Sequence, residues 1–309
     1  MATEIVSGKN LQRTIVTEAL AVASDLPRAP RCRLISVAGP DPMLAVNRAV
    51  HVRTLQTYGL ECEDVHLPAE TDLAGIEEVI SVANQDSGVD GVMVLLPLPE
   101  HLSLADILPL IKPEKELEGL HPGNAGAVLG HVNRMPESPD VLVTEALHAQ
   151  LEDIGFDLSN AHVVILSEAS LLGENVLANL VQRAAGPASL PLTTTVSLVV
   201  TENPRAREIA RQADLLVVSL ENPGVVGADY VKPGSVVIDF NPTLIGMTEV
   251  EGEPRPILKG GVRPEEMDTT SYYSPAPGGV GPVMLGILMR NLIRAAARGP
   301  RQKADEMPE

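Results

Sequence analysis

Short apolar runs alternate with amphipathic runs along most of the chain. The apolar runs end at turn residues, as strands buried on both faces do, whereas the amphipathic runs place apolar residues three to four positions apart, which is typical of helices. The predicted strands lie at residues 33–38, 63–66, 91–96, 162–166, 194–201, 215–219 and 236–240. The predicted helices lie at residues 10–24, 43–58, 72–86, 141–154, 173–183 and 205–212. This alternation implies parallel βαβ units. With 309 residues we expect an α/β protein of two domains, bridged by the helix at 141–154.

A stretch rich in glycine and proline, residues 274–282, precedes the last predicted helix. Its three glycines and three prolines cannot belong to a helix or a central strand. Pro282 suits the first turn of the helical run that follows. Arg290, Arg294 and Arg298 recur toward the end of that run, where cations complement the helix dipole. The stretch is either a turn before a core helix or a loop whose backbone N–H groups bind a ligand.

Four motifs stand in a fixed order along the chain. They are VDGVMVLLPLPEH at residues 89–101, EGLHPGNAG at 118–126, VKPGSVVID at 231–239 and SPAPGGVGP at 274–282. Together they resemble the motifs of the bifunctional methylenetetrahydrofolate dehydrogenase/methenyltetrahydrofolate cyclohydrolase family, over residues 5–297. The resemblance implies a folate-binding, catalytic-type domain (residues 1–145 plus 276–309, to which the last helix returns) and a Rossmann-like domain (residues 146–275). It also implies a tetrahydrofolate derivative as substrate, a cleft between the domains, and a homodimer.

The resemblance places the proton-transfer residues of the family on one predicted helix. The family carries a tyrosine there and, four residues later, a lysine that acts at the folate one-carbon centre. The gap-free correspondence from Gly39 to Leu60 puts Asn47 at the tyrosine and His51 at the lysine, and keeps a basic residue at Arg53. An imidazole can carry protons near neutral pH. The resemblance therefore implies catalytic roles for His51 and Asn47 and a substrate contact for Arg53, whereas a histidine on a helix is otherwise usually a surface or core residue.

Further substrate contacts of the family fall on scattered positions. They correspond to Leu95, Pro97, Glu118, Pro277, Gly278 and Gly279. Leu95 replaces a glutamine, and a leucine side chain can neither donate nor accept a hydrogen bond. Glu118 replaces an aspartate that anchors the pterin ring, and its carboxylate can still accept two hydrogen bonds from the 2-amino-pyrimidinone edge. The alternative for Glu118 is a solvated acid in a loop.

The dinucleotide contacts implied by the resemblance are Ser167, Glu168, Ala169 and Glu202. The first three replace a Gly-Arg-Ser turn whose arginine meets the 2′-phosphate of the cofactor. A glutamate about 4 Å from a phosphate is repelled by roughly 1–4 kcal/mol. Glu202 ends the next strand, where nucleotide-binding folds place an acid on the ribose hydroxyls. The sequence therefore leaves NAD open and predicts against NADP. Glu221 replaces a family glycine and keeps open the complete loss of dinucleotide binding.

Composition narrows the partners and the compartment. The formal net charge of −18 argues against nucleic acid and anionic membranes as partners, because both would be repelled. Cys32 and Cys62 are too few for a disulfide framework and predict reduced thiols in the cytoplasm. We recognise no signal peptide and no apolar run of transmembrane length. The seven histidines lack the spacing of metal ligands.

The sequence therefore predicts a divergent folate enzyme that acts on 5,10-methylene- or 5,10-methenyltetrahydrofolate. The replacements at Asn47, His51 and Leu95 favour hydrolysis, release or transfer of the one-carbon unit without hydride transfer. Two alternatives stay open. One is an NAD(P)-dependent methylenetetrahydrofolate dehydrogenase/cyclohydrolase that tolerates the replacements, and the other is a catalytically silent folate-binding protein.

Overall fold

The computed structural model describes residues 2–123, 139–168, 193–250 and 252–299. The chain forms two compact units. The six-stranded unit comprises Met1–Arg13 and Val143–Met284, and the three-stranded unit comprises Thr14–Leu142 and Leu285–Glu309. The chain changes unit after residues 142 and 284, near the expected divisions after residues 145 and 275. Residues Met1–Arg13 group with the six-stranded unit because strand β1 (Glu4–Ile5) pairs with β11 (Tyr272–Ser274).

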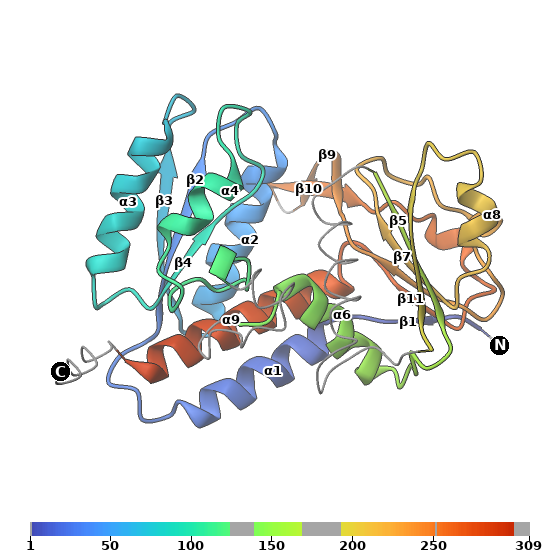
Figure 1. Ribbon diagram of the computed structural model, residues 1–309, viewed down its shortest axis with the longest axis horizontal. Coiled ribbons are helices and arrows are strands. Elements are labelled where there is room, and N and C mark those ends of the chain that lie inside the picture. The colour runs from blue at the N-terminus through green and yellow to red at the C-terminus, as the bar shows by residue number, and fades with distance from the viewer. Residues whose placement is uncertain (1, 124–138, 169–192, 251, 300–309) are drawn as a thin grey trace, which may run out of the picture. The chain divides into compact units, whose positions relative to one another are not determined.

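The three-stranded unit is built on a parallel sheet in the order β3-β2-β4 (Figure 1). Its strands are β2 (Arg31–Val37), β3 (Glu61–Leu67) and β4 (Gly91–Val94), and its helices include α2 (Met43–Thr57), α3 (Leu73–Gln85) and α4 (Leu104–Ile107). The central strand β2 is almost wholly buried, whereas the edge strand β3 alternates exposed and half-buried residues. Ile35, Ile76, Ile80 and Val92 belong to one apolar core. Except for the short α4, these elements confirm the predicted ones in order and kind.

The six-stranded sheet is parallel throughout, in the order β1-β11-β8-β7-β5-β6 (Figure 1). Its other strands are β5 (His162–Ser167), β6 (Thr195–Val200), β7 (Leu215–Ser219) and β8 (Val236–Asp239), and its helices include α6 (Leu142–Asp153) and α8 (Ala206–Ala210). Strands β6 and β7 lie on opposite sides of β5, so the strand order reverses there. The predicted Rossmann-like fold is confirmed, and sheets of this kind bind ligands outside the carboxyl ends of the strands at such a reversal. The helix predicted at 173–183 lies outside the described residues.

An antiparallel hairpin of β9 (Thr243–Val250) and β10 (Glu253–Lys259) was not predicted. It pairs with neither larger sheet. Pro254 and Pro256 lie inside β10, and proline in an apolar run argues against a central strand. A two-stranded hairpin has only edge strands, which tolerate proline. The strands β1 and β11 were also missed, because two or three residues are too few to show a periodicity.

The last helix, α9 (Val280–Arg298), contributes residues to both units. Val283, Ile287, Leu292 and Ile293 on it are buried. Among the described helices α9 alone is long and apolar enough to cross a membrane, whereas the sequence analysis predicted no apolar run of that length. Half of its most apolar stretch is buried inside the protein, as in a core helix.

Candidate active site

His51, the predicted proton carrier, is hydrogen-bonded to the backbone of Asn47, the other predicted catalytic residue. Its Nδ1 lies 2.7 Å from the backbone oxygen of Asn47, one turn earlier on α2. A carbonyl oxygen only accepts, so Nδ1 carries the proton and donates it, which leaves Nε2 of the neutral ring as an acceptor. Burial lowers the pKa of His51, and the bond to the Asn47 carbonyl offsets this only in part. Although some of the ring stays exposed, His51 is suited to act as a base rather than as an acid.

Asn47 and Arg53 differ in how the structure uses them. Asn47 is half-buried, and its backbone oxygen orients the His51 ring. Arg53 is exposed near the end of α2, and its own backbone oxygen accepts a bond from the Thr57 hydroxyl at 2.7 Å. The helix thus positions both residues, and their catalytic and substrate-binding roles stay predictions.

The end of β4 carries the next two predicted positions. Leu95 is only 3% exposed, and its backbone N–H donates to Ile35 in β2 at 2.8 Å. Its side chain therefore contributes to packing in the described structure, while Pro97, two residues later, is exposed. A leucine in place of a polar group is consistent with this burial, because a glutamine there would need hydrogen-bond partners.

Glu118 ends a short segment that runs alongside β4. The backbone N–H of Val92 donates to Lys115 at 2.8 Å, and Val92 forms a parallel bridge with Glu116. The segment therefore carries Glu118 toward the carboxyl end of β4. Burial, followed by the negative charge of Glu116, raises the pKa of Glu118 to about 8. At neutral pH Glu118 thus holds a proton, although the residue keeps part of its surface exposed.

The glycine- and proline-rich loop, residues 274–282, is tied down on two sides within the six-stranded unit. The Ser274 hydroxyl donates to the side-chain oxygen of Gln150 on α6 at 2.9 Å, and the Gly8 N–H donates to the backbone oxygen of Gly278 at 3.0 Å. A Cβ on Gly279 would collide with the Ser274 hydroxyl and lie 2.7 Å from the Pro275 oxygen. Gly278 has a φ of 111°, which only glycine adopts readily. Pro277 is exposed, so this fixed loop presents part of its backbone to solvent.

Two of the predicted dinucleotide contacts, Ser167 and Glu168, lie at the carboxyl end of β5, beside the reversal between β5 and β7. Glu168 follows β5, and its carboxylate accepts from the Asn222 side chain at 3.0 Å and from the Glu221 N–H at 3.3 Å, both after β7. The buried Ser167 hydroxyl donates to the Glu168 backbone oxygen at 2.6 Å. Glu202 is exposed after β6. Ala169 lies outside the described residues.

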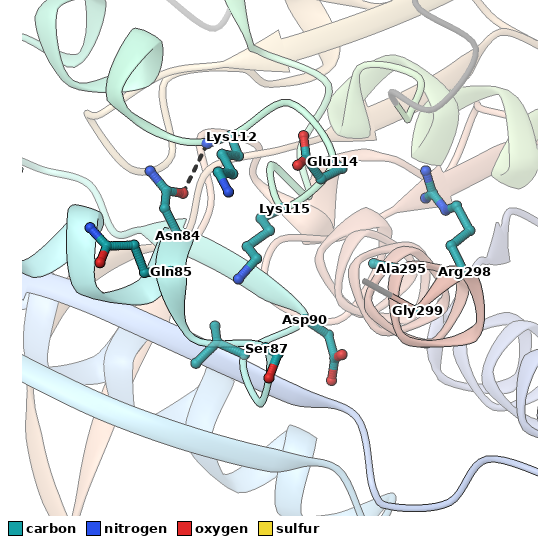
Figure 2. Close-up of a pocket in the computed structure, with 11 residues that line it drawn as sticks. Asn84, Gln85, Ser87, Asp90, Lys112, Glu114, Lys115, Ala295, Arg298 and Gly299 are labelled. Carbon is teal, nitrogen blue, oxygen red and sulfur yellow. Dashed lines mark hydrogen bonds between the residues drawn. The ribbon is translucent and has the colours of Figure 1, made fainter. Parts of the chain in front are cut away.

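A pocket of about 390 Å³ lies elsewhere in the three-stranded unit (Figure 2). Asp90 and Val89 in its wall directly precede β4, so it lies at the opposite end of that strand from Leu95. None of the predicted site residues lines it. The Lys115 ammonium donates there to the backbone oxygens of Ala83 and Asp86, at the end of α3. Lys115 in the pocket wall thus bonds the carbonyl end of α3, which is a structural role.

Metal ligation finds no support in the part of the chain that is described. No group of three or more His, Cys, Asp or Glu residues there could hold a metal ion.

Two family models together match nearly the whole chain. The tetrahydrofolate dehydrogenase/cyclohydrolase catalytic domain matches residues 6–118, and the NAD(P)-binding domain of the same family matches residues 143–299. The chain belongs to the tetrahydrofolate dehydrogenase/cyclohydrolase family. The family named from the four motifs is thereby confirmed, and so is the expectation of a folate one-carbon enzyme at the level of the family.

Relatives of full length agree with this assignment. The bifunctional protein FolD of Synechococcus sp. RCC307 is 33% identical over 90% of this chain and 89% of its own length. The FolD protein of Parvibaculum lavamentivorans is 32% identical over 96% of this chain and 97% of its own. Among solved structures, the Trypanosoma brucei methylenetetrahydrofolate dehydrogenase-cyclohydrolase, complexed with NADP and an inhibitor, is 25% identical with a TM-score of 0.82 over 96% of this chain and 98% of its own. The Campylobacter jejuni FolD structure is 24% identical, with a TM-score of 0.78 over 96% and 99% of the two chains, and shares the fold.

The prediction against NADP is wrong. The family model for residues 143–299 describes an NAD(P)-binding domain, and the Trypanosoma brucei relative was solved with NADP bound. The prediction assumed that the Glu168 carboxylate faces the phosphate. In the structure that carboxylate accepts hydrogen bonds from the Asn222 side chain and from the Glu221 N–H, two contacts that the sequence did not predict.

Two residues important for this geometry were missed in the sequence. The carboxylate of Glu116 is buried and bonded to the backbone of the turn that follows it. Gln150 anchors the loop through Ser274 from 124 positions away. The signal for Glu116 was an acidic residue two positions before Glu118 and three before Gly119, a turn-forming glycine. No local pattern in the sequence marks Gln150.

Proposed function

We propose that this protein acts on the one-carbon unit of 5,10-methenyl- or 5,10-methylenetetrahydrofolate by hydrolysis, release or transfer without hydride transfer. The observation that carries the proposal is the tautomer of His51. Its Nδ1 donates to the Asn47 oxygen and its pKa is lowered, so a neutral ring offers Nε2 as a base. Glu118, whose pKa is raised to about 8, is the proposed ligand of the pterin donor edge, which it binds as a carboxylate after releasing its proton.

In the hydrolytic step, a water oxygen attacks the methenyl carbon while His51 Nε2 accepts the proton of that water. In the neutral adduct the hydroxyl loses its proton as the carbon–oxygen double bond forms. The bond from the carbon to one folate nitrogen breaks with its electron pair on that nitrogen, which takes up the hydroxyl proton, and a formyl group is left on the other nitrogen. His51 then returns its proton to solvent, so water is the only co-reactant. Arg53, Leu95, Pro97 and the loop residues Pro277, Gly278 and Gly279 are the proposed substrate contacts, on the basis of the family motifs.

The deciding experiment follows methenyltetrahydrofolate by its absorbance in the absence of any nicotinamide cofactor. Wild-type protein should turn it over, and His51→Ala should lower kcat about 100-fold or more, the usual contribution of a positioned base. His101→Ala is the matched control, because His101 is exposed and its Nε2 lies 2.9 Å from the Thr71 backbone oxygen, away from the predicted site residues of α2. Equal rates for wild type and His51→Ala would remove His51 from the mechanism, and tight binding without turnover would favour the silent folate-binding alternative.

A second function is favoured by the NAD(P)-binding domain match and by the strand reversal between β5 and β7. Both support an NAD(P)-dependent methylenetetrahydrofolate dehydrogenase/cyclohydrolase. Ser167, Glu168, Ala169 and Glu202 are its proposed cofactor contacts. Reduced cofactor formed from methylenetetrahydrofolate with NAD or with NADP, followed by its absorbance, would decide for this function over the first.

We also propose a homodimer in the cytoplasm. The hairpin β9–β10 supports the dimer, because an isolated two-stranded hairpin is marginally stable in water and this one exposes Ile245, Met247, Val250 and Ile257. The net charge of −18 disfavours binding to nucleic acid and to anionic membranes, because both would repel the protein.

A further inference from the structure

A buried carboxylate organises the turn that carries Glu118. Glu116 is only 3% exposed, and its Oε1 accepts from the Glu118 N–H at 2.6 Å. Its Oε2 accepts from the His121 N–H at 3.3 Å, and the N–H groups of Gly119 and Leu120 also bond the carboxylate. Successive N–H groups that converge on one anion form a concave anion-binding turn. In this protein the anion is supplied by the chain itself.

The same turn is fixed from outside by two other parts of the three-stranded unit, α9 and residues 140–142. The Asn291 side chain on α9 donates to the Leu117 oxygen at 2.9 Å, and the Leu142 N–H donates to the Glu118 oxygen at 2.9 Å. Gly119 has a φ of 75°, and a Cβ there would lie 2.5 Å from the Asp140 oxygen. Both backbone groups of Glu118 are therefore bonded, which leaves its side chain as the part of the residue that can meet a ligand.

We propose that Glu116 is a positioning residue of the folate site, whose buried carboxylate holds residues 118–121 in the turn that presents the Glu118 side chain to the pterin. This inference rests on the proposed function. Glu116 does not touch substrate, because its oxygens face the backbone N–H groups of the turn.

The electrostatics of the pair give Glu116 a second effect on the same site. Burial raises the pKa of Glu116, while its bonds from backbone N–H groups oppose this rise. Among the described residues no backbone N–H group bonds the Glu118 carboxylate, and the pKa of Glu118 is raised by burial and then by the charge of Glu116. The buried Cys32 thiol on β2 is also coupled to Glu118, and burial raises the pKa of that thiol. The converging N–H groups thus favour the ionised form of Glu116, whereas nothing comparable in the described structure favours the ionised form of Glu118.

Glu116→Gln tests the proposal, with Glu114→Gln as the matched control. Glutamine keeps the size but brings an NH₂ group that cannot accept from the N–H groups of the turn. We expect KM for methenyltetrahydrofolate to rise about tenfold through the unpaired donors, with a smaller change in kcat. The pH midpoint of folate binding should move below the wild-type value, and amide exchange at residues 118–121 should speed up. Glu114→Gln should match wild type, because Glu114 lines the pocket at the other end of β4.

A purely structural role for Glu116 would lower Tm without moving the pH midpoint, and that result would overturn the proposal. If Glu116→Gln does not fold, Glu116→Asp decides. It keeps the charge with a shorter reach, so KM should rise while the pH midpoint stays near the wild-type value, and unchanged KM would overturn the proposal. Wild-type protein that binds no tetrahydrofolate derivative would overturn the proposed function and this inference together. Folate binding with an unaltered Glu116→Gln variant would overturn this inference alone.

Discussion

At the scale of single residues, burial shifts the pKa values of two side chains toward their neutral forms. It lowers the pKa of His51, whose Nδ1 donates to the Asn47 oxygen, and it raises the pKa of Glu118 to about 8 beside Glu116. Near neutral pH His51 is therefore available as a base, and Glu118 holds a proton in the free protein. The residue types were readable in the sequence, but their protonation states depend on burial and on neighbours that the sequence does not place.

Glu118 gives a pH-dependent prediction for folate binding. The donor edge of a pterin binds a carboxylate, so binding below pH 8 must release the proton that Glu118 holds in the free protein. We expect affinity to rise as pH approaches 8 and to level off above it. Calorimetry in two buffers of different ionisation enthalpy would measure the proton released. Glu118→Gln should abolish the release, and a wild type that binds without releasing protons would contradict this role.

The same residue predicts how stability depends on pH in the absence of ligand. The pKa of Glu118 is raised from 4.5 to about 8 on folding, so the folded state holds the proton more tightly than the unfolded state. The contribution of protonated Glu118 to the free energy of unfolding is fully present below pH 4.5 and is lost as pH rises through 8. Between these values the wild type should therefore lose Tm relative to Glu118→Gln, which scanning calorimetry at several pH values would detect.

At the scale of elements, α3 is stabilised at both ends by side chains. Asp72 accepts the Gly75 N–H at 2.9 Å at its start. The Lys115 ammonium donates to the Ala83 and Asp86 backbone oxygens at 2.6 and 2.8 Å at the end of α3. Neither contact was predicted from the sequence. An aspartate just before an apolar periodicity is a local capping signal, whereas Lys115 lies 30 residues beyond the end of the helix, where no local pattern connects the two.

We expect Lys115→Met to lower the free energy of unfolding by about 1–2 kcal/mol, because it removes a cation bonded to the carbonyl end of a helix. Urea unfolding measures the change. Lys112→Met is the control in the same loop, since Lys112 contacts Asn84 through its backbone N–H alone, at 3.0 Å. Its effect should stay within about 0.5 kcal/mol, as for most surface changes. Equal losses for the two variants would show that the Lys115 bonds do not stabilise α3.

The loop at residues 274–282 shows how an element can be recognised and yet not understood from sequence. The prediction that its glycines and prolines belong to no helix was wrong at its end, because Val280, Gly281 and Pro282 form the first turn of α9. A first helical turn tolerates proline, whose missing N–H would have no partner there. The contacts that hold the loop come from Gly8 and Gln150, at distant positions in the chain, which no local pattern reports.

At the scale of the whole molecule, the exposed hairpin gives a prediction about assembly. Met247 is 57% exposed and Ile245 is 45% exposed on β9. If a second copy covers this surface, Met247→Glu should convert the dimer to a monomer, because a buried charge without a partner is costly. Light scattering coupled to size exclusion reports the mass. Val82→Glu is the control, since Val82 is 54% exposed on α3 in the three-stranded unit. A wild type that is monomeric, or a Met247→Glu variant that stays dimeric, would exclude this surface.

The sequence determined the alternation of the longer parallel strands and helices, the α/β class and the family. Each of these follows from periodicity and motif, which are local or depend only on order along the chain. It also placed Asn47 and His51 one turn apart. The tertiary structure alone decided that Leu95 is buried, that Glu168 bonds the segment after β7, and that Glu116 fills the turn before His121. Each of these outcomes depends on which residues, distant in the sequence, the fold brings into contact with a given carboxylate or apolar side chain. A local sequence pattern carries no information on such contacts.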